Sequence, residues 1–296
     1  MSNTVSPSAN RRYGMRRVCQ EWGAPRATMY RHKRSLQNAT TSAAKKRGPK
    51  TKHTDAELVT EIRAAIESSP FVGEGHRKVW AQLRAKGITT SKKRVLRLMR
   101  ENKLLAPGRP KRVLGPRAHD GTIVTDAPNV MWGTDATTVL TLDEGNATVF
   151  IAVDHCTSEC VGIHAAKRGD RFEALEPIRQ GVRDHFGTYD AGAAKGLTLR
   201  HDNGTQYTSD DFQDEIDFLG IESSPSFVRS PEGNGCAERF IRTLKEQLLW
   251  VQAFRTVEEL RAALMEWAVT YNEHWLVERH GHRSPRAIRR QFEEAA

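Results

Sequence analysis

The chain has 296 residues, of which 38% are hydrophobic, 7% aromatic and 28% charged, and its formal net charge is +10. This length allows two or three domains and one sizeable core. No run of about eighteen apolar residues occurs and no apolar signal-peptide core follows the polar N-terminus, so we expect a cytoplasmic protein without a membrane span.

The charge is divided unevenly along the chain. Residues 1–117 hold 28 Lys and Arg against 7 Asp and Glu, a net charge of +21, whereas residues 118–296 hold 18 against 29, a net charge of −11. A solvated surface explains basic residues but not their segregation. The pattern therefore predicts a nucleic-acid-binding front half joined to a domain rich in carboxylates.

The first 39 residues contain a candidate helix-turn-helix. Residues 15–35 suit two short helices around a turn at Gly23, with Pro25 placed for the start of the second helix. A generic helical pair is the alternative. If the unit binds DNA, Arg26, Thr28 and Arg31 are the candidates for its groove-facing surface. Residues 40–53 then form an expected basic linker, which is rich in Lys, Gly and Pro.

Residues 54–104 predict a second helical DNA-binding domain. Thr54 and Glu57 have the spacing of a capping box, a second helix covers residues 76–86, and a third begins at Thr90 or Ser91. The third helix combines a buried apolar stripe with a cationic surface suited to phosphates, namely Lys92, Lys93, Arg94 and Arg97. A small bundle with a basic surface is the alternative. The Pro-rich residues 105–122 are interpreted as a linker.

Residues 123–250 change to a mixed pattern. We expect strands at 130–140, 147–154, 159–165, 197–200 and 221–228, with helices at 171–186 and 209–219 and a further helix after the last strand. The first three strands form an antiparallel meander, and the fourth is parallel to a meander strand after a helical crossover. This order predicts an α/β fold of the ribonuclease H type, with a mixed five-stranded sheet. Residues 251–296 are expected to form a C-terminal helical extension.

Three acids stand out in this domain. Asp135 falls inside the first strand, Asp202 falls at the end of the fourth, and Glu238 follows Asp202 with 35 residues between them. A carboxylate in an apolar strand is costly to bury unless a cation compensates it, so the three acids suggest a divalent metal site. On the helix that carries Glu238, Arg242 and Lys245 share its face. Asp154 is an alternative fourth ligand that we interpret as a strand-end turn residue.

The four cysteines are scattered without a C-x-x-C pair, which argues against a zinc ribbon or a disulfide framework. One alternative is a zinc site formed by His155, Cys156, Cys160 and His164. Because side chains alternate across a strand, these ligands would be split between two faces. Reduced, partly buried thiols are the favoured interpretation.

Several motifs resemble those of one known family. WGTDAT at residues 132–137, HDNGTQYT at 201–208, NGCAERF at 234–240, TLK at 243–245, YN at 271–272 and SP at 284–285 are similar to the DDE transposases of bacterial insertion sequences, within the retroviral-integrase superfamily. Residues 75–77 and 94–100 also match their upstream helix-turn-helix. The chain departs from the family in carrying its own N-terminal helical pair, which many relatives encode in a separate frame, and in lacking a zinc-binding His/Cys domain.

The resemblance implies a DNA transposase that cuts and joins strands at the ends of an insertion sequence. Asp135 would bridge two Mg²⁺ or Mn²⁺ ions, Asp202 would hold one and Glu238 the other. Water would first attack a phosphate and cut the DNA beside the end of the element. The freed 3′-hydroxyl would then attack a target phosphate and join the end to it. The expected partners are double-stranded DNA, both element ends and target, and further copies of the chain in a homo-oligomer on DNA. The candidate DNA contacts near the cut are Lys245, Arg242, Asn234 and Asn203.

Other interpretations of these residues remain open. Asn203 and Asn234 could be turn formers, Asn203 could instead orient Asp202, and Arg242 could pair with Glu238 or Glu246. At the level of function, one rival is a nuclease of the same fold that does not join strands. The other is a domesticated, non-catalytic DNA-binding regulator.

Overall fold

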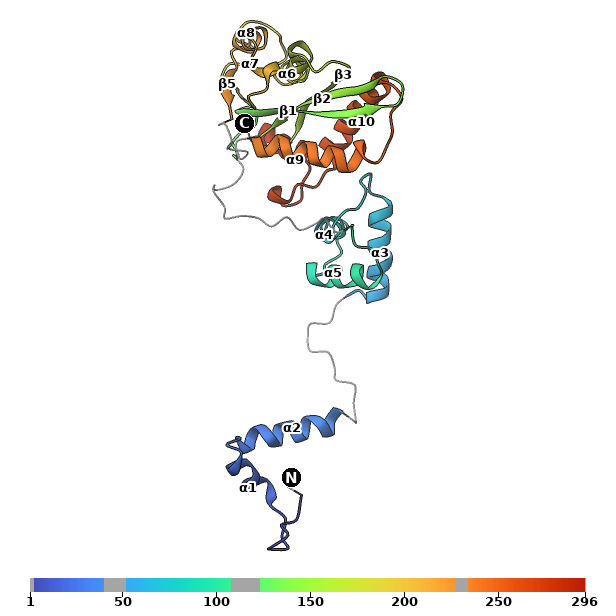
Figure 1. The fold of residues 1–296 in the computed structure, drawn as a ribbon, viewed down its shortest axis with the longest axis vertical. Helices are drawn as coiled ribbons and strands as arrows, with labels where there is room; N and C mark the ends of the chain where they lie inside the picture. The colour runs from blue at the N-terminus through green and yellow to red at the C-terminus, as the bar shows by residue number, and fades with distance from the viewer. Residues whose placement is uncertain (1–2, 40–51, 108–122, 227–233, 296) are drawn as a thin grey trace. The chain divides into compact units, whose positions relative to one another are not determined.

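The computed structural model describes residues 3–39, 52–107, 123–226 and 234–295 (Figure 1). The chain forms two compact units, Met1–Lys52 and His53–Ala296, which are considered separately. Most of each expected linker, residues 40–51 of the first and 108–122 of the second, lies outside the described residues. Within the part of the chain that is described, no helix is long and apolar enough to cross a membrane.

The first unit contains a pair of helices, α1 (Gly14–Glu21) and α2 (Arg26–Ala39). The turn between them is closed by a hydrogen bond from the Ala24 amide to the Cys19 carbonyl. Cys19 is the buried residue of α1, whereas Trp22 and Tyr30 are exposed. The two helices predicted for residues 15–35 are therefore present, but they bury little apolar surface.

The second unit begins with three helices, α3 (Asp55–Glu67), α4 (His76–Ala85) and α5 (Lys92–Glu101). The Thr54 side chain accepts from the Glu57 amide and the Glu57 carboxylate accepts from the Thr54 amide, which confirms the capping box. The Ser91 side chain caps α5 by accepting from the Arg94 amide at 3.2 Å. The apolar stripes of the three helices meet in one small core, which includes Leu58, Ile62, Val79, Leu83, Val95, Leu98 and Met99.

The rest of the unit is built on one mixed sheet of five strands in the order β3-β2-β1-β4-β5. The strands are β1 (Met131–Thr141), β2 (Gly145–Asp154), β3 (Cys160–Ala166), β4 (Thr198–His201) and β5 (Glu222–Pro225). The first three are antiparallel neighbours, while β4 pairs in parallel with both β1 and β5. This order confirms the predicted α/β fold of the ribonuclease H type.

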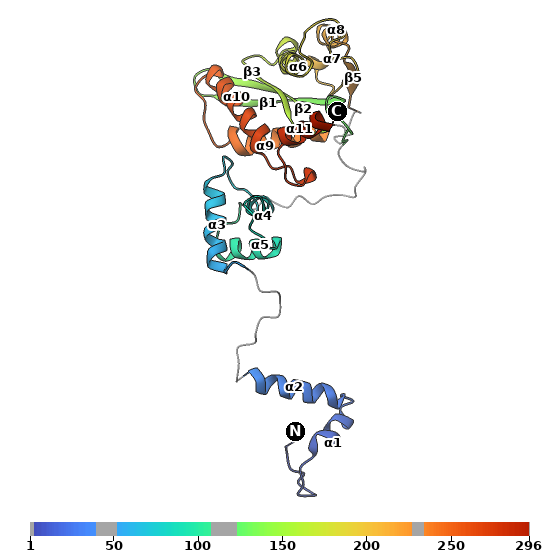
Figure 2. The ribbon, with the colours of Figure 1, turned by 180° about the vertical axis from the view of Figure 1, so that it is seen from behind.

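Helices cover both faces of the sheet, as the two opposite views show (Figures 1 and 2). On one face lie α6 (Arg171–Phe186), the short α7 (Thr205–Thr208) and α8 (Asp210–Phe218). On the other lie α9 (Gly235–Leu244), its π-helical continuation η2 (Lys245–Leu249) and α10 (Val257–His274). Each face has its own apolar core. The sequence did not predict α7, because four residues are too few to show a helical period.

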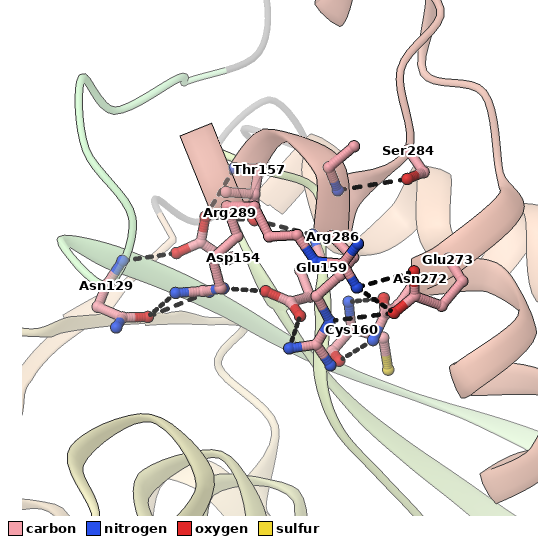
Figure 3. Close-up of polar contacts among 12 residues, drawn as sticks. Asn129, Asp154, Thr157, Glu159, Cys160, Asn272, Glu273, Ser284, Arg286 and Arg289 are labelled. Carbon is pink, nitrogen blue, oxygen red and sulfur yellow. Dashed lines mark hydrogen bonds and ion pairs between the residues drawn. The ribbon is translucent and has the colours of Figure 1, made fainter. Parts of the chain in front are cut away.

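The C-terminal segment, which contains the short η3 (Glu278–His280) and α11 (Pro285–Ala295), is attached to the end of the meander. Asn272 of α10 pairs with the backbone of Cys160, accepting from its amide and donating to its carbonyl, each at 2.9 Å. Arg286 and Arg289 of α11 both form ion pairs with Glu159, which is 1% exposed (Figure 3). The extension is therefore held to the sheet by buried polar contacts as well as by apolar packing.

Candidate active site

Asp135 lies on β1, and Asp202 directly follows the end of its parallel neighbour β4. β1 and β4 run in parallel with Trp132 opposite Leu199 and Gly133 opposite Arg200, and continuing this register for two residues places Asp135 beside Asp202. The Asp135 carboxylate accepts from the Ala136 amide at 2.8 Å, and the Asp202 carboxylate accepts from the Gly204 amide at 2.8 Å. Each acid thus keeps oxygen lone pairs for other ligands.

Glu238 approaches Asp135 from the other face of the sheet. It is exposed in the first turn of α9, which packs on β1 and β2 through buried residues such as Ala237 and Phe240. Asn234, at the start of this helix, donates its side-chain amide to the Thr134 carbonyl at 2.7 Å. Glu238 follows Asn234 by four residues, which is about one turn of a helix. The contact of Asn234 with Thr134, the residue before Asp135, therefore lies one turn before Glu238.

The electrostatics of Asp135 agree with this convergence. The pKa of its carboxyl is raised to about 6, chiefly by burial and in addition by the charges of Asp202 and Glu238, while the Ala136 amide and Lys245 act in the opposite direction. Burial also raises the pKa of Glu238. A divalent cation beside Asp135 would offset both the burial and the neighbouring charges that oppose its ionisation.

Hard carboxylate oxygens are the ligands that Mg²⁺ and Mn²⁺ prefer, so the donor set fits a divalent ion. Among the described residues, however, no group of three His, Cys, Asp or Glu side chains is close enough together to hold a metal ion. The charges of Asp202 and Glu238 nevertheless act on Asp135, and the side chains of both residues are exposed.

The alternative zinc site gains no support. All four cysteines are buried and free. The His155 Nδ1 lies 3.0 Å from the Ile123 carbonyl, and the His164 Nε2 lies 2.6 Å from the Glu173 carboxylate. Both histidines are therefore used in local contacts, and no metal-binding group of three occurs in the described ranges.

The four candidate DNA contacts of this domain differ in what their side chains do. Lys245 opens η2 and is half-buried, close enough to Asp135 to lower its pKa. Arg242 is exposed and pairs with Glu246 at 3.1 Å. Asn203 is exposed and donates to the Ser226 carbonyl at 2.9 Å. The fourth, Asn234, is 5% exposed and its amide is bound to the backbone of β1.

The candidates on α5 also divide into two groups. Arg94 donates to the Asp55 carboxylate at 2.6 Å and to the His53 carbonyl at 2.9 Å, with 17% of its side chain exposed. Arg97 is more exposed but pairs with Asp55 and Glu101. Lys93 is exposed, and Lys92 is exposed with its ammonium 4.4 Å from the centre of the Trp80 ring. In the first unit, the three candidates Arg26, Thr28 and Arg31 are exposed on α2.

Tyr207 is a residue of this site that sequence reasoning missed. It is fully buried, and its hydroxyl has no hydrogen-bond partner among the described residues. Burial raises its pKa, and the charges of Asp135 and Asp202 add to this effect, so the phenol lies near both acids. The available signal was its place in the HDNGTQYT motif, five residues after Asp202.

Comparison with known proteins gives family-level matches over most of the chain. An HTH-like domain model matches residues 52–112, and two integrase core domain models match residues 125–231 and 219–285. The transposase InsD of insertion element IS2 from Escherichia coli is 31% identical over 254 residues, which cover 82% of each chain.

Solved structures with a similar fold include the catalytic core domain of BIV integrase, at 21% identity and a TM-score of 0.43, covering 56% of this chain and 97% of that one. A second is the HTLV-2 integrase catalytic core domain in complex with magnesium, at 18% identity and a TM-score of 0.42, covering 55% of this chain and 98% of that one.

Proposed function

Because the chain belongs to the transposases of bacterial insertion elements, we propose that it cuts and joins DNA strands through Asp135, Asp202 and Glu238, the acids of a D-D-35-E site. The observation that supports this proposal is the approach of the three carboxylates from β1, the end of β4 and the first turn of α9. Burial and the charges of Asp202 and Glu238 oppose the ionisation of Asp135, which a divalent cation would offset.

Two Mg²⁺ or Mn²⁺ ions would supply activation of the attacking oxygen and neutralisation of the leaving oxygen. Asp135, between the other two acids, would contact both ions, while Asp202 and Glu238 would each contact one. Lys245 and Arg242 would bind the phosphates beside the scissile bond and fix them for in-line attack. The nucleophile is water in the cutting step and the freed 3′-hydroxyl in the joining step, so no covalent bond to the protein is required.

The two helical units would hold the DNA. In this proposal residues 1–39 and 54–104 bind the element ends, residues 123–250 carry out the chemistry and residues 251–296 support the catalytic domain. Lys92, Lys93 and Arg97 are placed to neutralise phosphates along α5. Joining two ends at one target needs two active sites in one complex, so the working form is a homo-oligomer on DNA in the bacterial cytoplasm.

The test is a joining assay with the full-length protein, a duplex that copies the inverted repeat bordering the gene, and a supercoiled plasmid as target. With Mg²⁺ or Mn²⁺ the wild-type protein should insert the duplex end into the plasmid. Asp135→Asn and Glu238→Gln should abolish joining while duplex binding persists. Asp190→Asn, which changes an exposed acid outside the site, is the matched control and should join normally.

Two results would overturn the proposal in different directions. Cutting of the duplex without joining, under all conditions, would identify a nuclease. Binding of the duplex with neither cutting nor joining, unchanged by Asp135→Asn, would identify a DNA-binding regulator.

A further inference from the structure

Asn234 stands at the N-cap of α9 but does not cap it. Asparagine is favoured at this position because its side chain accepts a hydrogen bond from an amide of its own first turn. Thr54, Ser91, Asp170 and Thr256 do this for their helices. Asn234 makes no such bond, so its helix forgoes a usual source of stability. Its side chain has another use.

The Asn234 side chain instead forms a hydrogen bond to the sheet. The Asn234 amide nitrogen donates to the Thr134 carbonyl at 2.7 Å, joining residues 100 positions apart. Its carbonyl oxygen is buried and has no hydrogen-bond partner among the residues that the structure describes, so the bond to Thr134 fixes the orientation of the amide. The reverse orientation would place two carbonyl oxygens against each other. Asn234 therefore joins the first turn of α9 to the residue beside Asp135.

The contact is close enough to require glycine in the strand. A Cβ atom at Gly133 would lie 2.7 Å from the Asn234 carbonyl oxygen and 2.8 Å from the His155 Nε2. His155 is itself fully buried, and its pKa is lowered chiefly by burial, which keeps the ring neutral. Asn234 thus lies against Gly133 and Thr134, and both Asn234 and His155 approach Gly133 too closely for a side chain there.

We propose that Asn234 is a positioning residue that holds the start of α9 against β1, so that Glu238 faces Asp135 across the metal site. Asn234 is the N-cap of α9, and Glu238 follows it by four residues, about one turn of the helix. Holding Asn234 in place therefore fixes the position of Glu238 along the axis of α9 and its rotation about that axis. This inference rests on the proposed function, and it assigns Asn234 a role other than direct DNA contact. A side chain that is 5% exposed, with its donor already bound to backbone, offers little to a phosphate.

The experiment measures Mn²⁺ binding by the full-length protein with electron paramagnetic resonance, in wild type, Asn234→Ala, Glu238→Gln and the double variant. Loss of a residue that orients a metal ligand weakens metal binding by about 10- to 100-fold. We expect such a loss in Asn234→Ala, with affinity for the inverted-repeat duplex changed less than about twofold. The matched control Asn146→Ala removes an exposed asparagine from the start of β2 and should bind Mn²⁺ as wild type does.

The double variant separates positioning from a general effect on folding. If Asn234 acts through Glu238, Asn234→Ala should lower Mn²⁺ affinity no further once Glu238 is Gln, because coupled residues are non-additive. Additive losses would overturn the proposal, as would unchanged Mn²⁺ affinity in Asn234→Ala. Duplex affinity that falls tenfold while Mn²⁺ binding holds would make Asn234 a DNA contact instead. Failure of wild type to bind Mn²⁺ or join DNA would count against the proposed function, not against the placement of Asn234.

Discussion

Two acidic regions of the same sheet differ in how their charge is balanced. Asp154 and Glu159 at the end of the meander are 0% and 1% exposed, and the protein supplies their partners. Asp154 accepts from the Asn129 amide and from the amide and hydroxyl of Thr157, while Glu159 pairs with two arginines of α11 (Figure 3). Asp202 and Glu238 are exposed, and the charges of both act on Asp135.

The two regions are close together. Asp154 lies opposite Trp132, three residues before Asp135 on β1, which is about 10 Å along a strand. Burial of a carboxylate is therefore not by itself a sign of function in this sheet. What distinguishes the candidate active site is that burial and the charges of Asp202 and Glu238 oppose the ionisation of Asp135, and Lys245 offsets only part of this effect. The predictions that follow test this contrast.

The largest expected effect is that of Asp135→Asn on joining. Loss of the bridging carboxylate should reduce joining at least about 1000-fold, or about 4 kcal/mol of transition-state stabilisation. The fold should not be weakened, because the change removes a repelled charge. Joining yield and urea unfolding of the same preparation measure both. Joining within tenfold of wild type would remove Asp135 from the chemistry.

In the region of Asp154 and Glu159, the change Glu159→Gln should lower the stability of the fold instead. It leaves the buried Arg289, which is 3% exposed, without its countercharge, and such losses reduce the free energy of unfolding by about 3 to 5 kcal/mol. Urea denaturation measures the change. The double variant Glu159→Leu with Arg289→Met is the control and should recover most of the loss. A decrease below about 1 kcal/mol for Glu159→Gln would show that this pair is not what holds α11.

The pH dependence of stability should also separate the regions. The Asp135 carboxyl has a pKa of about 6 in the folded protein and 3.8 ordinarily, so the folded state keeps a proton that the unfolded state has lost. Without metal, this group should therefore make the protein less stable by about 1 to 3 kcal/mol as pH rises from 4 to 6.

Urea unfolding at both ends of that range, for wild type and Asp135→Asn, measures the contribution as a difference between the two proteins. Added Mg²⁺ should remove most of this destabilisation by Asp135 at pH 7. Identical pH dependence in the two proteins would contradict the raised pKa of Asp135.

The smallest effect applies the same contrast to the cations of α5. Lys93→Ala should weaken duplex binding only a few-fold and reduce the slope of log affinity against log salt concentration by about 1, because it removes one phosphate contact. Arg94→Ala should instead destabilise the helical domain, since Arg94 is paired with Asp55. Salt titration of duplex binding and thermal unfolding measure the two. Equal salt slopes for Lys93→Ala and wild type would exclude Lys93 as a phosphate contact.

Sequence reasoning located features that depend on local pattern. Alternation and helical spacing predicted the strand and helix order, and they placed Asp135 inside the first strand and Asp202 at the end of the fourth. Features that depend on long-range pairing were not visible. The basic residues of α5 form one cationic face in sequence, but Arg94 is used by Asp55, 39 residues away. Local pattern also did not reveal the pairing of Glu159 with Arg289, which are 130 residues apart, or the hydrogen bond from the buried Asn234 amide to Thr134.

Anomalous diffraction at the manganese edge, from crystals of the protein with a joined duplex and Mn²⁺, tests the central claim most directly. The account predicts two peaks about 3.5 to 4 Å apart, with Asp135 touching both and Asp202 and Glu238 touching one each. Peaks elsewhere in the protein, or an ordered complex in which Glu238 stays away from the metal held by Asp135, would contradict it.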